Sequence, residues 1–199
     1  MTMETTRDNG WSLLTEFVKG DTLLRHCLSV EACMRHYARI FDEDEVLWGF
    51  AGLIHDFDFE IHPALDKHPQ DGAPILRERG VPEDVIEVVL SHADHLDAPR
   101  DTPIKKTLAA VDELSSFVVA VALVRPTKSL DDVGPRSVKK KMKDKAFARA
   151  VDRDAMIATA GHLGVDFDEH IVNVVNGLKP IASQVGLVSE VEASGVAGA

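Results

Sequence analysis

The amino-acid sequence predicts an all-α fold, a compact single-domain bundle of about seven or eight helices. Apolar residues recur at steps of three and four along most of the chain, which is the period of a helix with one buried face. No segment alternates apolar and polar residues over the length of a strand. The 199 residues, 45% of them hydrophobic and 28% charged, are enough for one large domain with its own core.

Helix-capping residues stand before the periodic stretches in the first third of the chain. Asp21 is the expected N-cap of a helix that runs to about Phe41, along which one apolar stripe repeats. Asp42 or Asp44 caps the next helix, EVLWGFAGLIHD, which is apolar on nearly all sides and is therefore predicted to be central and buried. The following residues, 57–67, are predicted to form a loop.

The later helices begin at a proline or an acidic N-cap, and several end at a glycine or before a proline. They are predicted at residues 69–80, 82–95, 102–125 and 152–163, and from residue 166 onward. A loop and the basic stretch RSVKKKMKDKAFAR lie between the third and the fourth of these. The small and polar residues 188–199 are expected to form a frayed C-terminal tail.

The charge balance and the cysteines narrow the classes of function. With 22 basic against 33 acidic residues, the formal net charge is -11, which disfavours binding to a nucleic-acid polymer. No apolar run approaches the length of a membrane span, and the N-terminus lacks the apolar core of a signal peptide. Cys27 and Cys33 are too few for a disulfide framework. We therefore expect a cytoplasmic protein with reduced thiols and no membrane partner.

The histidines are concentrated in one part of the chain, because seven of the nine lie between positions 26 and 95. Four ionisable residues fall within or at the end of apolar helices: His26, His55, His92 and Asp112. Burying an ionisable group without a partner is costly, and one metal ion can serve several such groups at once. A single such histidine is more often a hydrogen-bonded core residue, but four such residues on separate helices favour a metal centre over that interpretation.

The order of four side chains resembles the HD-domain superfamily of metal-dependent phosphohydrolases: His26, His55, Asp56 and Asp112. The segments KHPQDGAPIL and VVLSHADH supply His68 and His92, where the binuclear branch of that superfamily has extra histidines. The stretches HDFDFEIHP, AAVDELSSFVVAVALVRPTKS and RSVKKKMKDKAFA look like one bacterial subfamily of predicted HD/HDIG hydrolases. This similarity covers residues 10–187, which we take as the domain.

The resemblance implies a ligand set for two metal ions. The first ion would be held by His26, His55, Asp56 and Asp112, and the second by Asp56, His68 and His92. Asp56 would then be the central catalytic carboxylate, shared by both ions. Imidazole and carboxylate ligands suit iron, manganese, cobalt, nickel, magnesium or zinc, so one or two divalent ions of any of these are expected. Such an ion lowers the pKa of a bound water towards neutrality, which supplies a nucleophile for phosphorus.

Several residues near the HD pair have more than one interpretation. Asp58 and Glu60 follow the pair closely, and either is a candidate for the general acid, for a group that orients a ligand histidine, or for a solvated carboxylate. For Asp58 we favour the orienting role. His92 and His95 share a helix face, and the family pattern favours His92 as the ligand. His95 and His62 are then substrate contacts or ordinary surface histidines.

Cationic side chains are candidates for binding an anionic substrate. Lys140 lies in the basic stretch 136–149, which is either a solvated helix face or a positive surface folded over the metal site. Lys105 and Lys106, about two turns before Asp112, are rivals for the same role, as is the segment 125–128.

The leading functional hypothesis is a metal-dependent phosphohydrolase, phosphomonoesterase or phosphodiesterase, acting on a small phosphate ester such as a nucleotide. One alternative is a di-iron HD-type oxygenase that cleaves a C–C or C–P bond, since the same six ligands serve both chemistries. Another is a non-catalytic module that binds a nucleotide, which the complete ligand set disfavours. Hydrolysis of cyclic dinucleotides is a minor option, because the GYP signature of that branch is replaced here by LDAPRDTP.

Overall fold

The computed structural model describes residues 2–149 and 151–188, and within these ranges the chain forms nine α-helices and three short 3-10 segments. The predicted all-α class is confirmed, and a single isolated bridge between Ser129 and Val188 is the one β-type pairing in the described ranges. The elements are α1 (Arg7–Phe17), α2 (Asp21–Phe41), α3 (Glu45–Ile54), α4 (Ala73–Glu78), α5 (Glu83–Ser91), η1 (Asp94–Leu96), α6 (Pro103–Leu123), η2 (Leu130–Asp132), α7 (Pro135–Met142), α8 (Arg153–Leu163), α9 (Phe167–Leu178) and η3 (Lys179–Val185).

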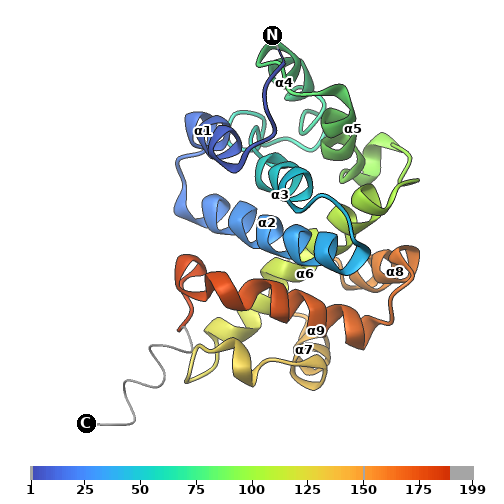
Figure 1. The fold of residues 1–199 in the computed structure, drawn as a ribbon. Helices are drawn as coiled ribbons and strands as arrows, with labels where there is room; N and C mark the ends of the chain where they lie inside the picture. Colours follow the sequence, from blue (N-terminus) through green and yellow to red (C-terminus); the bar gives the residue numbers. More distant parts are fainter. Residues whose placement is uncertain (1, 150, 189–199) are drawn as a thin grey trace.

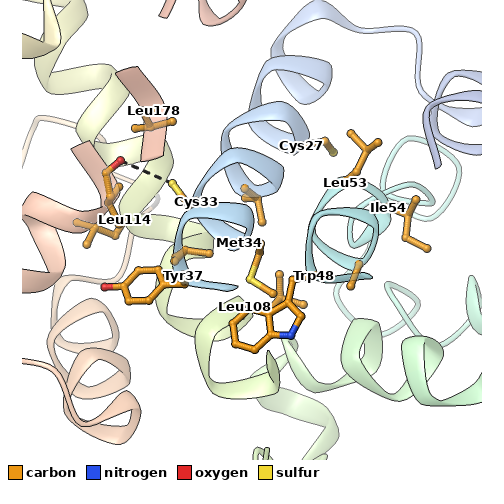
Figure 2. Close-up of a cluster of buried hydrophobic side chains, with 14 of the residues drawn as sticks. Cys27, Cys33, Met34, Tyr37, Trp48, Leu53, Ile54, Leu108, Leu114 and Leu178 are labelled. Carbon is orange, nitrogen blue, oxygen red and sulfur yellow. Dashed lines mark hydrogen bonds between the residues drawn. The ribbon is translucent and has the colours of Figure 1, made fainter. Parts of the chain in front are cut away.

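Helix α2 forms the centre of the bundle (Figure 1). It packs against α3 on one side and against α6 and α9 on the other. Figure 2 shows this arrangement, with Leu53 of α3 beside one face of α2 and Leu114 of α6 and Leu178 of α9 beside the other. The thiol of Cys33 in α2 contacts the carbonyl of Val174 in α9 at 3.8 Å. The two long helices α2 and α6 pack directly against each other, which matters because each carries a candidate ligand.

Gly52 allows α3 to approach α2 closely. A Cβ atom at this position would lie 2.8 Å from the Cγ atom of Met34 and 3.2 Å from the backbone oxygen of Val30, so no side chain fits between the helices. The close approach brings the C-terminal end of α3, where His55 stands, against the N-terminal half of α2. A glycine in a helix is unfavourable by about 1 kcal/mol relative to alanine, which the contact of α3 with α2 offsets.

Most of the predicted helix starts are confirmed. Asp44, Asp152 and Asp166 each accept hydrogen bonds from backbone amides of the first turn that follows them, as N-caps do. The prediction that Asp21 is an N-cap is wrong, because Gly20 takes that place. The carboxylate of Glu60 accepts from the amides of Lys19 and Gly20 at 2.9 and 2.8 Å, so a distant side chain supplies the acceptors next to the start of α2.

Three helix boundaries differ from the prediction. Helix α1 was not predicted, although Thr6 caps it and Leu13 and Leu14 bury its inner face. The helix expected from residue 69 begins at Ala73, after a series of turns. The helix expected to reach residue 95 ends at Ser91, because the side chain of Arg100 donates to the carbonyl oxygens of Ser91 and His92 and so satisfies the helix end.

Two further expectations have a structural outcome. None of the helices in residues 2–149 and 151–188 combines the length and the apolar character that crossing a membrane requires. Cys27 and Cys33 are both free and buried. The expected frayed tail cannot be compared beyond Val188, since residues 189–199 lie outside the described residues.

Candidate metal centre

Six side chains from five parts of the chain converge between α2, α3, α5 and α6. Three of them sit at the C-terminal end of a helix, so the positions of these three follow from the helix lengths. His55 is the C-cap of α3 and Asp56 follows it, His92 is the C-cap of α5, and His68 lies in the turns before α4. His26 and Asp112 project from the long helices α2 and α6. These are the six residues that the family resemblance implies as ligands.

The first group of donors consists of His26, His55 and Asp112. The Nε2 atom of His26 lies 3.1 Å from the Nε2 atom of His55 and 3.1 Å from Oδ1 of Asp112. The Nε2 atom of His55 lies 3.4 Å from the same carboxylate oxygen. The imidazole of His55 is fully buried, whereas the side chain of Asp112 keeps 20% of its surface exposed. The group is therefore a compact triad with one side open to solvent.

The second group consists of Asp56, His68 and His92. Oδ1 of Asp56 lies 3.0 Å from Nε2 of His68 and 3.4 Å from Nε2 of His92, and the two imidazole nitrogens are 3.1 Å apart. The other oxygen of the same carboxylate, Oδ2, lies 3.2 Å from Nε2 of His26 in the first group. Asp56 thus presents Oδ2 to the first group and Oδ1 to the second, and Oδ1 also lies 3.5 Å from Nε2 of His55. A carboxylate placed between two donor groups in this way can bridge two cations.

The second ring nitrogen of every histidine is engaged on the outer side of the cluster. Nδ1 of His55 donates to the carbonyl of Gly52 at 2.8 Å, and Nδ1 of His92 donates to the carbonyl of Val89. Nδ1 of His68 lies 2.8 Å from Oδ1 of Asp58, and Nδ1 of His26 lies 2.8 Å from the hydroxyl of Ser116. Such outer contacts fix the ring orientation and the tautomer of a metal-binding histidine.

These outer contacts leave two imidazole lone pairs facing each other inside the cluster, and a cation between them would remove their repulsion. A carbonyl or carboxylate oxygen only accepts, so Nδ1 of both His68 and His92 carries the hydrogen, and Nε2 of each neutral ring carries a lone pair. The two lone pairs then face each other across 3.1 Å. A proton or a metal ion between them removes the repulsion, and the donor set suits a metal ion.

The spacing of the donors also fits a single ion in each group. An ion about 2.1 Å from each ligand atom places neighbouring ligands about 3.0 Å apart at right angles and about 3.4 Å apart in a tetrahedron. The donor separations within the two groups range from 3.0 Å, between Asp56 and His68, to 3.4 Å, between Asp56 and His92. The residues present therefore fit the divalent cations that the sequence implied.

Without a cation, protons hold the cluster together. Burial opposes a charge on His26, but hydrogen bonds to Asp112 and then Asp56 raise its pKa to about 10. For His68 burial is likewise outweighed, by Asp56 and Asp58, and its pKa is raised to about 9. Burial would raise the pKa of Asp112, but hydrogen bonds to His26 and His55 hold it well below its usual range. The same groups that bind protons so tightly in this state are those that would exchange them for metal.

A cavity of about 80 Å³ opens beside the cluster, between α5, α6 and α8. His92 and Asp112 line it together with Arg100, Glu113 and Met156. Glu113 is next to Asp112 in the sequence, and burial, followed by the charge of Asp112, raises its pKa to about 7. The guanidinium of Arg100 is held by Asp94 at 2.6 Å and by backbone carbonyls. The cavity is polar and leads directly to the donors.

The residues that follow His55 and Asp56 differ in their contacts, and these contacts favour different roles for them. The carboxylate of Asp58 is fully buried behind His68 and makes its hydrogen bond to the outer nitrogen of that ring. This placement favours the orienting role over proton donation. Glu60 is engaged with the start of α2, so the structure gives it a structural role rather than an acid's. His95 is exposed and its Nε2 lies 3.2 Å from the side-chain oxygen of Gln70, and His62 is only partly buried.

The predicted substrate-binding lysines lie away from the donors. Lys105 is buried on α6, and its ammonium contacts the carboxylates of Glu87 at 3.1 Å and Asp101 at 3.3 Å. Two carboxylates already balance its charge, so a substrate anion gains little from it. Lys140 is exposed on α7 and lines a cavity that contains none of the six donors. Substrate binding by Lys105, Lys140 and His95 stays a prediction.

The outer contacts and one wall of the site were not predicted from the sequence. Ser116 lies one turn after Asp112 on α6, a spacing that places both on one face, and this was the available signal. The carbonyls of Gly52 and Val89 carry no sequence signal, since any residue has one. Arg100 and the α8 residues Met156 and Thr159 reach the cavity through the tertiary fold alone.

Comparisons with known proteins agree with the geometry. The family model that matches is that of the HD domain, over residues 23–117, a range that contains all six donors. A ribonuclease Y from Acholeplasma laidlawii (strain PG-8A) is 31% identical over 98 residues. That stretch is 49% of this chain but 18% of the relative, so this chain matches less than a fifth of the ribonuclease. No solved structure matches the chain.

Proposed function

We propose that this chain hydrolyses a small phosphate ester. Through residues 23–117 it belongs to the HD-domain superfamily of metal-dependent phosphohydrolases. The observation that carries the proposal is the division of the Asp56 carboxylate between two donor groups, with one oxygen 3.2 Å from His26 and the other 3.0 Å from His68. Divalent cations bound there would lower the pKa of a coordinated water and neutralise charge on the phosphoryl oxygens.

The residues of the chain have separable tasks in this proposal. His26, His55 and Asp112 would hold one ion, and His68 and His92 the other, with Asp56 between them. Asp58 and the Val89 carbonyl keep the lone pairs of His68 and His92 directed inward, because each accepts the hydrogen on the outer nitrogen. The buried ring of His55 excludes water from the inner side of the centre, so substrate and water enter from the side where Asp112 is partly exposed.

Two features support a small ester over a polymer. The cavity that leads to the donors has a volume of about 80 Å³, which is the scale of a phosphate group rather than of a nucleic-acid strand. The net charge of -11 gives long-range repulsion towards a polyanion. The name of the ribonuclease relative points to a phosphodiester, but the match covers only 18% of that protein, so we propose the smaller substrate.

The test is elemental analysis of protein purified without added metal, followed by turnover of a panel of phosphate monoesters and diesters by the same sample. Asp56→Ala and Asp112→Ala should each lose bound metal and turnover, because each removes a carboxylate that contacts two imidazoles or more. The matched control is Asp66→Ala, which removes an exposed carboxylate from the loop between Asp56 and His68; this variant should keep both its bound metal and its turnover.

Full metal content in both variants would refute the assignment of the centre. A wild-type sample with two bound iron atoms that hydrolyses no ester would refute the reaction while leaving the centre intact, and would favour oxygenase chemistry at the same six donors.

A further inference from the structure

A second cavity lies at the start of α7 and carries the basic residues that the metal centre leaves unused. It has a volume of about 480 Å³ and is formed by the segment after α6, by η2 and by the first turns of α7. Three of its lining side chains are cations, Arg125, Arg136 and Lys140, and one is an acid, Asp132. The cavity therefore has an excess of positive charge in a chain whose formal net charge is -11.

The three cations have no ion-pair partner in the part of the chain that the structure describes. Neighbouring lysines of the same helix are paired, since Lys139 contacts Asp168 and Lys141 lies 3.9 Å from Asp144. None of Arg125, Arg136 and Lys140 forms an ion pair with any residue in the ranges that the structure describes. Like charges gathered around one cavity repel one another, and a bound anion would remove that repulsion.

The acid in the cavity does not neutralise these cations. Oδ2 of Asp132 accepts a hydrogen bond from the hydroxyl of Thr127 at 2.6 Å, which holds the carboxylate against its own loop. The Nε atom of Arg125 is buried and has no hydrogen-bond partner among the described residues. A buried donor without a partner costs about 1–3 kcal/mol, so a polar ligand that accepts this hydrogen bond would gain from it.

The cavity is remote from the metal centre. Arg125 follows Asp112 by 13 residues along α6 and just beyond its end, which corresponds to about 20 Å at 1.5 Å per residue. No residue lines both this cavity and the one beside the donors. In Figure 1, α7 lies at the end of the molecule opposite α4 and α5. A ligand in the cavity would therefore be bound independently of the reacting phosphate.

We propose that Arg125, Arg136 and Lys140 together form a second anion site, which binds the phosphate group of a small phosphorylated molecule away from the metal centre. Guanidinium groups match the geometry of phosphate oxygens and Lys140 adds a third charge, so a doubly charged phosphate is preferred over a carboxylate. The N-terminal end of α7, which begins at Pro135, adds a partial positive charge on the same side. The cavity volume of about 480 Å³ also accommodates a small molecule attached to the phosphate.

The proposal is tested by titrating the full chain with inorganic pyrophosphate, measured by calorimetry, in an Asp56→Ala background that disables the metal centre. Removing two cations with Arg136→Gln and Lys140→Gln should weaken binding about tenfold or more, because two charge-assisted contacts are lost. The matched control, Lys139→Gln with Lys143→Gln, removes the same charge from exposed positions of the same segment that do not line the cavity. This control should change the affinity for pyrophosphate by no more than about twofold, since it alters only long-range electrostatic interactions, which salt screens.

Amide chemical shifts locate the bound anion. Saturating pyrophosphate should shift the amide signals of Gly134 and Ser137, which line the cavity, and leave that of Gly52 in α3 unchanged. Equal affinities of the two double variants, or shifts spread over the whole surface, would overturn the site. A single-stranded RNA oligonucleotide that binds far more tightly than pyrophosphate, and loses its affinity with Arg136 and Lys140, would overturn the small-molecule ligand in favour of a polymer. Because the metal centre is disabled throughout, failure here leaves the proposed hydrolase activity untouched.

Discussion

Replacing Asp58 should weaken the second metal position without disturbing the first. Among the described residues, the carboxylate of Asp58 forms one hydrogen bond, with the outer nitrogen of His68 at 2.8 Å, and it lies outside both donor groups. In Asp58→Ala the imidazole of His68 loses the acceptor that fixes its tautomer, so its inner lone pair is no longer held towards Asp56. His26 and His55 keep their own outer contacts, and Asp112 keeps its contacts with both imidazoles; none of these involves Asp58.

The size of the effect follows from the lost contact. A hydrogen bond to a charged group contributes about 1.5–3 kcal/mol, and loss of an orienting partner behind a metal ligand typically costs about 10- to 100-fold in metal affinity. The two ranges agree, because 1.4 kcal/mol corresponds to about tenfold in a binding constant. We therefore expect the second ion to bind about 10- to 100-fold more weakly and the first with unchanged affinity.

The measurement is a calorimetric titration of metal-free protein with Mn²⁺, in which two binding steps are resolved. Asp58→Asn is the conservative variant, since its carbonyl oxygen still accepts from His68, and it should recover part of the lost affinity. Asp66→Ala, in the exposed part of the loop, should behave as wild type. If Asp58→Ala binds both ions with wild-type affinity, the orienting role is wrong. If it weakens both steps equally, the effect is a general loss of structure rather than a change at His68.

Three further predictions concern protons and a buried hydrogen bond. At a pH of about 7.5, metal binding should release about two protons, because His26 and His68 have pKa values of about 10 and about 9 without metal and bind a metal ion in the deprotonated form. Calorimetric titrations in buffers of different ionisation enthalpy measure the number of protons released, and a value of zero would contradict the prediction. Both pKa values exceed the value of about 6.5 in the unfolded chain, so between pH values of about 6.5 and about 10 the native metal-free protein binds more protons than the unfolded chain does. Its free energy of unfolding, measured by urea denaturation, should therefore fall as the pH rises from about 6.5 towards about 10. Tyr37→Phe should lower the free energy of unfolding, measured in urea, by about 1–3 kcal/mol. The reason is that Nδ1 of His170 accepts a hydrogen bond from the tyrosine hydroxyl at 2.6 Å, while Nε2 of the same ring donates to the carbonyl of Ala110. An unchanged urea midpoint would show that this buried contact does not stabilise the fold.

The long helices were predictable because their burial pattern is regular. Helix α2 runs from Asp21 to Phe41 with one apolar face, and α6 begins at Pro103 after the Thr102 N-cap. Helix α1 was not predicted because it has few apolar positions, and its stability comes from packing against α3. The C-terminal end of α5 depends on Arg100, which lies nine residues beyond Ser91, and the start of α2 depends on Glu60, which lies 40 residues beyond Gly20, so the residues within each helix could not fix these boundaries.

The donors were predictable from the resemblance, but their surroundings were not. The six residues converge as that resemblance implies, with Asp56 between the two groups. The order of residues cannot reveal that the carbonyls of Gly52 and Val89 set the tautomers of His55 and His92, because backbone contacts carry no residue type. Nor could it show that Glu87 and Asp101 balance the charge of Lys105, since pairing of charges depends on the fold.

The most direct test of the two-ion centre is anomalous diffraction from crystals of the wild-type protein soaked in Mn²⁺. Two anomalous peaks should appear, one among His26, His55 and Asp112 and the other beside His68 and His92, with an oxygen of Asp56 directed at each. Absence of any peak between these side chains in crystals that bind manganese elsewhere would contradict the metal centre, and with it the reaction proposed for this protein.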